Sequence, residues 1–276
     1  MTVQAYRTES GLAVTLRWVL LAALVASTVL PPTGLNPALG LVVGELPVVI
    51  AIWHFAAWTN WRTAIAGFAI VYVVAYSFEF VGTHTGLVFG NYYYSPTAIG
   101  PLLFEVPVLL PLGYFAMAYG AYITTRLMLR NIHRRLGGLE TVITAVLSAL
   151  VMTAIDLASD PIASTLLGKW TWEDGGSYFG VPVHNYLGWL ATTFTFFLLI
   201  TLMLNLRVNE PLLARYRSGG FYAQAIVLYA TFGMAVLWNP LLGRTGEIYD
   251  SMAMMAGLVM TIPIITAAMS LRSADR

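Results

Sequence analysis

Residues 183–206 read VHNYLGWLATTFTFFLLITLMLNL, and this stretch carries no Asp, Glu, Lys or Arg. A helix needs about 20 mainly apolar residues to cross the hydrocarbon core of a bilayer, so the stretch is long enough to span it. Similar apolar stretches recur along most of the 276 residues. Charged residues make up 10% of the chain, against about 25% in a typical soluble domain. The sequence therefore predicts one integral-membrane domain over residues 1–276, an all-α bundle of transmembrane helices.

Eight transmembrane helices are expected from these apolar stretches. They lie near residues 12–30, 36–58, 62–81, 101–129, 139–158, 183–206, 221–239 and 250–271. Asn36-Pro37 is typical of an N-cap followed by proline at the first helical position. The fourth segment contains Pro107 and Pro111, so it can begin late, kink, or enter the membrane as an interfacial piece. The first segment is followed by further spans, so we expect an uncleaved helix there and not a signal peptide.

The basic residues predict the orientation of the bundle. With eight spans, twelve arginines fall on one side of the membrane: Arg7, Arg17, Arg62, Arg126, Arg130, Arg134, Arg135, Arg207, Arg215, Arg217, Arg272 and Arg276. The other side keeps only Lys169 and Arg244. Positively charged residues concentrate in cytoplasmic loops, so we expect both termini in the cytoplasm and a multi-pass protein of the cell membrane.

Composition and motifs exclude several classes of protein. A net charge of +1 provides no basic field for nucleic acid. The absence of cysteine removes disulfides, thiolate nucleophiles and Cys-ligated metals. Lys169 is the only lysine and is expected in a loop, so no span can hold a retinal Schiff base. The four histidines form no i, i+4 pair, so we expect no metal site. Neither a P-loop nor a G-x-S-x-G motif is found, which argues against the enzyme classes that carry them.

The acidic residues near the spans gather at one side of the predicted bundle. Glu79 ends the third segment, Glu105 lies near the start of the fourth, and Asp156 and Asp160 end the fifth. All four fall on the outer side of an eight-span chain. An ionisable group inside a bilayer costs roughly 2.5–3.5 kcal/mol on insertion scales, so such a cluster is not expected from scattered solvating charges. These four residues are therefore the candidate catalytic groups.

Asp156 and Asp160 are four residues apart and share one face if their helix continues. Two close carboxylates cannot both ionise cheaply, so one is expected to keep its proton and serve as a general acid. The alternative for Asp160 is an N-cap of a short helix at 161–167, because Pro161 follows it. Glu79 lies at the predicted C-terminus of its helix, where a negative charge is mildly unfavourable, and this favours a functional role for it.

Two predicted outer loops, 82–100 and 159–182, are rich in aromatic residues. These residues are Tyr92, Tyr93, Tyr94, Trp170, Trp172, Tyr178 and Phe179. Each alone is typical of the aromatic belt found at membrane interfaces. As a group beside acids, their ring faces can line a site for a cationic intermediate. His84, in the first loop, is a candidate proton shuttle or ligand, although a lone interfacial histidine is usually neither.

Three blocks of sequence resemble a known family. The first block is Glu79-x2-Gly82-x3-Gly86-x3-Gly90-x-Tyr92, and the second is GPLLFEVP at residues 100–107. The third block has three parts: Asp156-x3-Asp160-Pro161, Trp170-x-Trp172, and YFGVPVHNYLGW at residues 178–189. Together they resemble an integral-membrane family of carotenoid biosynthesis proteins that includes bisanhydrobacterioruberin hydratases and carotenoid 1,2-hydratases. The likeness covers residues 35–190, and it departs at His184, where a small polar residue is expected before Asn185.

The resemblance implies addition of water to a terminal C=C bond of an acyclic carotenoid, which gives a tertiary alcohol and requires no cofactor. It implies acid, base and water-positioning roles for Glu79, Glu105, Asp156 and Asp160. The expected substrate-binding residues are His84, Tyr92, Tyr94, Trp170, Trp172, Tyr178, His184 and Asn185. The expected partners are the carotenoid, water and the lipid bilayer, and other membrane enzymes of the same pathway are candidates.

Other functions remain open at this point. A membrane prenyltransferase that elongates carotenoids would hold a diphosphate through magnesium on aspartate-rich motifs, and Asp156-x3-Asp160 supplies one such motif without a second. A carotenoid cyclase shares the protonation step. A transporter or pigment-binding protein would suit a helix interrupted by Pro107 and Pro111, but the two halves of the chain show no paired interruptions.

Overall fold

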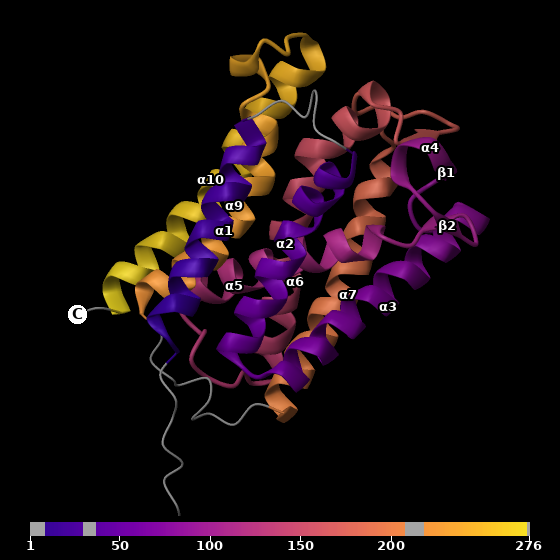
Figure 1. The fold of residues 1–276 in the computed structure, drawn as a ribbon. Helices are drawn as coiled ribbons and strands as arrows, with labels where there is room; N and C mark the ends of the chain where they lie inside the picture. The colour runs from indigo at the N-terminus through magenta and orange to yellow at the C-terminus, as the bar shows by residue number, and fades with distance from the viewer. Residues whose placement is uncertain (1–8, 30–36, 208–217, 275–276) are drawn as a thin grey trace, which may run out of the picture.

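A computed structural model describes residues 9–29, 37–207 and 218–274, which form a bundle of long helices (Figure 1). The long helices are α1 (Gly11–Val29), α2 (Pro37–Trp58), α3 (Trp61–Thr85), α5 (Leu110–Met128), α6 (Gly138–Pro161), α7 (Val183–Arg207), α9 (Gly219–Leu237) and α10 (Glu247–Ala274). Among the described residues, six of these helices, all except α2 and α5, are long and apolar enough to cross a membrane. The predicted helical membrane protein is therefore confirmed, while the count of eight spans and the cytoplasmic termini stay predictions. Asn36, the predicted N-cap of α2, lies outside the described residues.

The bundle has an enclosed interior and an apolar exterior. About 61% of the apolar stretch of α6 and 56% of that of α9 are buried, whereas only 17% is buried in α1 and 28% in α3. Helix α5 is buried along most of its length. In α10 the buried share is 33%. A helix that is apolar on its outward face suits contact with lipid, so α1, α3 and α10 form the periphery of the bundle.

Helix α3 continues one turn past the predicted end at residue 81. It ends at Thr85, and Gly86 adopts a left-handed φ of 68° while its N–H donates to the carbonyl of Gly82. A glycine in this conformation is a usual helix terminator. Gly86 ends the helix, whereas Gly82, the first glycine after Glu79, lies inside it. The prediction that Glu79 ends the helix is therefore wrong. Glu79 lies inside α3, on its buried face.

Residues 101–109 form a hairpin and not the start of a long helix. Strand β2 (Leu102–Leu103) pairs with β3 (Val106–Pro107), and α5 begins only at Leu110. The predicted helix start at 101 is wrong, whereas the late start that the prolines allowed is confirmed. The hairpin turn holds Phe104 and Glu105 at φ values of 47° and 64°, in the left-handed region.

The α3 helix supplies hydrogen bonds to this hairpin. The hydroxyl of Tyr76 donates to the carbonyl of Leu103 at 2.7 Å, and the hydroxyl of Tyr72 donates to the carbonyl of Val108 at 3.0 Å. Backbone carbonyls outside regular helices need hydrogen-bond donors, and these two hydroxyls supply them. The two tyrosines explain how this segment can remain non-helical beside α3.

Helix α6 runs through Asp160 and Pro161 and is followed by η1 (Ile162–Leu166), a π-helical segment. The N-cap interpretation of Asp160 is therefore wrong, and Asp156 and Asp160 share one helix face as the spacing predicted. Proline has no N–H for the carbonyl four residues earlier, which belongs to Leu157. The hydroxyl of Tyr178 donates to that carbonyl at 3.2 Å and so replaces the missing bond.

A two-stranded ribbon joins the two aromatic loops. Strand β1 (Tyr92–Tyr94) is antiparallel to β4 (Trp170–Trp172), with Tyr92 opposite Trp172 and Tyr94 opposite Trp170. Tyr92 and Tyr94 are buried, and Tyr93 points outward. The ribbon, the short helix α4 (Pro96–Ile99) and the hairpin lie at one end of the bundle, next to the end of α3 (Figure 1).

Candidate active site

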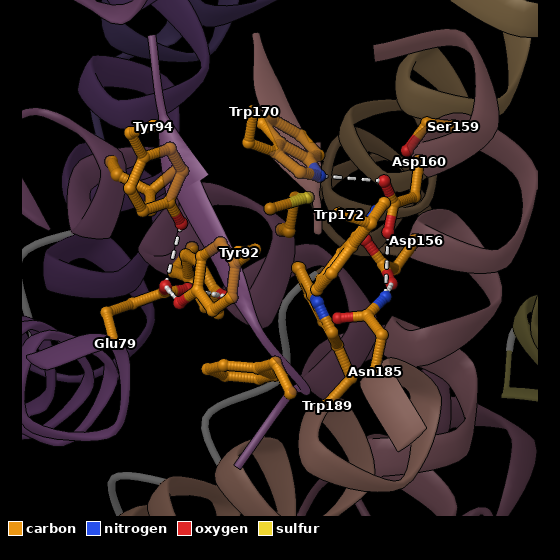
Figure 2. A pocket seen from close by; sticks show the side chains of 14 residues that line it. Glu79, Tyr92, Tyr94, Asp156, Ser159, Asp160, Trp170, Trp172, Asn185 and Trp189 are labelled. Carbon is orange, nitrogen blue, oxygen red and sulfur yellow. Dashed lines mark hydrogen bonds between the residues drawn. The ribbon is translucent and has the colours of Figure 1, made fainter. Parts of the chain in front are cut away.

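A cavity lies under the β1–β4 ribbon, where α3, α5, α6 and α7 meet (Figure 2). Its empty volume, counted out to its open mouth, is about 570 Å³. Its lining comprises Glu79, Phe89, Tyr92, Tyr94, Leu110, Tyr114, Met117, Asp156, Ser159, Asp160, Trp170, Trp172, Asn185 and Trp189. The described lining residues therefore include three acids and many aromatic rings, without a Lys, Arg or His to neutralise the acids.

Glu79 forms one pole of this cavity. Its Oε2 accepts hydrogen bonds from the hydroxyls of Tyr92 at 2.5 Å and Tyr94 at 2.7 Å, and its Oε1 accepts one from Tyr114 at 2.6 Å. The side chain is only 3% exposed. Three phenolic donors thus replace the water that a carboxylate loses on burial, and such charge-assisted bonds are among the stronger hydrogen bonds in proteins.

Tyr92 and Tyr94 belong to the ribbon, outside the helices. Burial and the nearby negative charge of Glu79 raise the pKa of each phenol well above its usual value. Both side chains therefore keep their protons at physiological pH. They can act as permanent hydrogen-bond donors to Glu79.

Asp156, Asp160 and Asn185 form the opposite pole. The amide nitrogen of Asn185 donates to Oδ2 of Asp156 at 3.0 Å and to Oδ2 of Asp160 at 2.7 Å. The indole nitrogen of Trp170 donates to Oδ1 of Asp160 at 3.0 Å. Asp156 is 5% exposed and Asp160 1%. In the described part of the chain, no group of three His, Cys, Asp or Glu side chains has the arrangement of a metal site.

Aromatic rings stand between the two poles. Figure 2 shows Glu79 with Tyr92 and Tyr94 on one side, and Asp156, Asp160 and Asn185 on the other. The ring of Trp189 stacks on that of Tyr114, with centroids 4.7 Å apart. The Tyr92 ring lies 5.0 Å from the Trp172 ring across the ribbon. Because ring faces attract cations, this wall can stabilise a positive charge that forms between the acids.

The structure brings together most, but not all, of the residues predicted for the site. Eight of them line the cavity: Glu79, Tyr92, Tyr94, Asp156, Asp160, Trp170, Trp172 and Asn185. Four predicted residues do not line it: His84, Glu105, Tyr178 and His184. The expected gathering of four acids is thus reduced to three.

These four residues have other contacts or positions, and the hydroxyl of Tyr178 donates to the carbonyl of Leu157. Glu105 is exposed at the hairpin turn, where its backbone lies in the left-handed region. One ring nitrogen of His84 contacts the carbonyl of Phe80 at 2.8 Å, and Nε2 of His184 contacts the carbonyl of Leu87 at 2.9 Å. Both histidines are exposed: His84 contacts the backbone of its own helix, and His184 of α7 contacts the backbone of the first aromatic loop.

Tyr114 and Trp189 were not predicted as site residues. Trp189 follows Asn185 by four residues, so helical spacing alone placed it on the same face of α7. Tyr114 reaches Glu79 from α5, and no spacing in the sequence relates these two residues. The remaining lining residues that the prediction missed are Phe89, Leu110, Met117 and Ser159.

Comparison with known proteins agrees with these features. A family model described as carotenoid biosynthesis protein matches residues 36–263, which include every residue that lines the cavity. The bisanhydrobacterioruberin hydratase of Haloarcula japonica is 30% identical over 167 residues, which cover 58% of this chain and 52% of that protein. The chain thus spans about half the length of this curated relative, and no solved structure matches it. Because the family model covers most of the sequence, this membrane protein belongs to the carotenoid biosynthesis protein family.

Proposed function

We propose that the protein is a carotenoid hydratase, which adds water across a terminal C=C bond of an acyclic carotenoid. The observation that carries the proposal is the cavity in which three buried carboxylates face a wall of aromatic rings. This combination suits a reaction that passes through a carbocation, since it offers proton donors, negative charge and ring faces together. The similarity to a protein named as a hydratase supports the same reaction.

The reaction balances without a redox partner. The π electrons of the C=C bond take a proton from a carboxylic acid of the Asp156–Asp160 pair, which forms a C–H bond and leaves a positive charge on the tertiary carbon. The oxygen of a water molecule then bonds to that carbon. The resulting oxonium returns a proton to the carboxylate, and the product is a tertiary alcohol. A positioned acid or base typically contributes about 10²–10⁴-fold to such a reaction.

The location of the cavity suits an apolar substrate and a polar co-substrate. The cavity lies at one end of the bundle, where the helices give way to loops and strands. We propose that this end lies at the outer face of the cell membrane. The end group of the carotenoid would enter the cavity while the rest of its chain stays in lipid, and water would reach the cavity from the interface.

Expression in bacterial cells that accumulate an unhydrated acyclic carotenoid tests the proposal. We expect the pigment to gain the mass of one water per reacted end, with heavy-oxygen-labelled water supplying the new hydroxyl. A cyclase would give an isomer of unchanged mass, and a prenyltransferase would add isoprenoid carbons in a magnesium-dependent way. Cells without the protein serve as the control. Unchanged pigment in the presence of folded, membrane-inserted protein would show that hydration of that carotenoid is wrong.

A further inference from the structure

We infer that the two aspartates have different roles: Asp156 carries the proton and gives it to the alkene, while Asp160 remains an anion that positions it. The chemical step rests on the proposed hydratase function. The location of the proton rests on the hydrogen bonds and the charged groups of the site, and it can be tested without a carotenoid.

Asn185 determines which oxygens are free to carry a proton. An amide that faces two acids presents its NH2 group, whose two hydrogens suffice for one bond to each. Accordingly, Oδ2 of Asp156 and Oδ2 of Asp160 both accept from the Asn185 nitrogen. Neither Oδ2 can then hold a proton directed at that amide, so the proton of the pair belongs on one of the two Oδ1 atoms.

The two Oδ1 atoms differ in their surroundings. Oδ1 of Asp160 accepts the indole N–H of Trp170 at 3.0 Å. No described residue donates a hydrogen bond to Oδ1 of Asp156, which belongs to a residue that lines the cavity. Hydrogen bonds to the charged form of a carboxyl group favour that form. Asp160, with two donors, is therefore the better anion, and the proton on Asp156 has an oxygen free of competing donors.

The other groups around the pair make a second anion on Asp156 unfavourable. Asp160 lies on the same helix, Glu79 approaches from α3, Tyr114 from α5, Tyr186 from α7, and Tyr92 from the ribbon faces Asp160. Glu79 is supported as a carboxylate by its three phenolic donors. With Asp160 and Glu79 both negative and no basic side chain among the described lining residues, loss of the Asp156 proton would place a third negative charge in one cavity.

In this scheme a single atom, Oδ1 of Asp156, both gives the proton to the substrate and takes it back. The O–H bond of Asp156 breaks as the C–H bond of the substrate forms, and Asp156 becomes a carboxylate next to the new carbocation. After water adds, the oxonium gives its proton to Oδ1 of Asp156, which restores the starting state. Asp160 keeps its charge throughout and is a positioning residue in this scheme, as are Asn185 and Trp170.

Infrared spectroscopy of the purified protein tests the location of the proton directly. A protonated carboxyl group gives a C=O stretching band that shifts in D2O. We expect Asp156→Asn to remove one such band, and Asp160→Asn to keep it but lose it at a lower pH than the wild type. Asp250→Asn, which removes an exposed acid at the start of α10, is the matched control and should change nothing. A band that survives in Asp156→Asn and is absent at every pH in Asp160→Asn would overturn the assignment.

The pH profile of hydration supplies a second test. Asp156→Asn should lower activity about 10²–10⁴-fold at every pH, as expected for loss of a general acid. Asp160→Asn should move the loss of activity to lower pH, because the charge that retains the proton is gone. Trp170→Phe should move it to higher pH, because Asp160 without its indole donor competes for the proton. Trp61→Phe, at an exposed position in α3, is the control and should cause no shift.

Opposite shifts in Asp160→Asn and Trp170→Phe would not arise from a merely structural disturbance. The proposal is overturned if Asp160→Asn is as inactive as Asp156→Asn at every pH, or if both variants shift the profile in one direction. If the wild type forms no hydrate at all, the hydratase function fails, and the infrared spectra still decide which aspartate carries the proton.

Discussion

Glu79 is the residue whose environment is most completely defined. A carboxylate has about four lone-pair sites, and three of them accept the phenols of Tyr92, Tyr94 and Tyr114. The neutral tyrosines leave the negative charge of Glu79 intact while they fix its position. Glu79 is therefore suited to stabilise a carbocation that forms between it and the aspartates, which a mobile carboxylate would do less well.

Removal of the Glu79 charge and removal of its donors should have graded effects. We expect Glu79→Gln to lower the hydration rate about 10²–10³-fold, as for loss of a preorganised electrostatic group. Tyr92→Phe or Tyr94→Phe should each lower it about 10- to 100-fold, because a hydrogen bond to a charged group contributes ~1.5–3 kcal/mol. The amount of hydrate per unit of folded protein is the measurement.

Tyr93→Phe is the matched control for these variants. Tyr93 lies between the two donors on β1, and its side chain is 54% exposed on the outer face of the ribbon. Its hydroxyl can be removed without loss of a contact to Glu79, so activity should stay at the wild-type level. Full activity in Glu79→Gln, or an equal loss in Tyr93→Phe, would contradict the role given to Glu79.

The same tyrosines predict how stability depends on pH. The pKa values of Tyr92 and Tyr94 are raised in the folded state, whereas tyrosine in an unfolded chain has a pKa of about 10. Above that pH the unfolded chain releases protons that the folded chain retains, so the free energy of unfolding falls as pH rises. The double variant Tyr92→Phe/Tyr94→Phe should show a shallower fall than the wild type in detergent-solubilised thermal unfolding between about pH 9.5 and 11. An identical slope in the wild type and the double variant would show that these phenols do not contribute.

At the scale of elements, the sequence predicts those features that local periodicity determines, and it does not predict those that depend on pairing between distant segments. Helix α7 was predicted at 183–206 and runs from Val183 to Arg207. The shared face of Asp156 and Asp160 also follows from spacing within one helix. By contrast, β1 and β4 have three residues each, too few to show an alternating pattern, and each pairs with a strand far away in the sequence.

The limits of the predicted site follow the same physical distinction. Tyr114 meets Glu79 only because α3 and α5 pack together, and neither segment carries a local signal of that contact. Glu105 is grouped with the other acids because the predicted eight-span topology places all four on the same side of the membrane. Its position depends on a hairpin turn with two non-glycine residues in the left-handed region, a conformation that sequence propensity does not favour.

Close packing of α7 against the first aromatic loop can be tested at Gly188. A Cβ at this position would lie 2.2 Å from the carbonyl oxygen of Val88 and 2.6 Å from the ring of Phe89, which lines the cavity. We expect Gly188→Ala to lower the free energy of unfolding by about 1–3 kcal/mol, as typical of overpacking, and to lower hydratase activity. Thermal unfolding in detergent measures the first effect.

Gly44→Ala provides the control for this substitution. Gly44 lies in α2, and no atom approaches within 4 Å of the position of its added Cβ. Alanine there should be neutral or stabilise the helix by up to about 1 kcal/mol. A Gly188→Ala variant as stable and active as Gly44→Ala would show that the loop does not press against α7 in this way.

At the scale of the whole molecule, the two ends of the bundle use different chemistry. The end that holds the cavity carries the buried acids and the aromatic ribbon. The opposite end carries Arg126, which is buried and donates to the side chain of Asn131 at 2.6 Å and to the carbonyl of Arg134 at 2.8 Å. Here the guanidinium holds the turn between α5 and α6. Because arginine concentrates on cytoplasmic sides, this separation supports placing the cavity at the outer face.

Cysteine labelling can test this orientation, since the chain contains no cysteine and the wild type is its own unlabelled background. Glu247→Cys lies at the exposed start of α10, at the cavity end, and Gly138→Cys lies at the exposed start of α6, at the arginine end. With eight spans and cytoplasmic termini, a membrane-impermeant maleimide should label Glu247→Cys in intact cells and Gly138→Cys only after permeabilisation. The reverse pattern would place the acids at the cytoplasmic face, and labelling of both in intact cells would contradict a consistent sidedness. The expected pattern would place the cavity end at the outer face, the side from which water would reach the carboxylates in the proposed reaction.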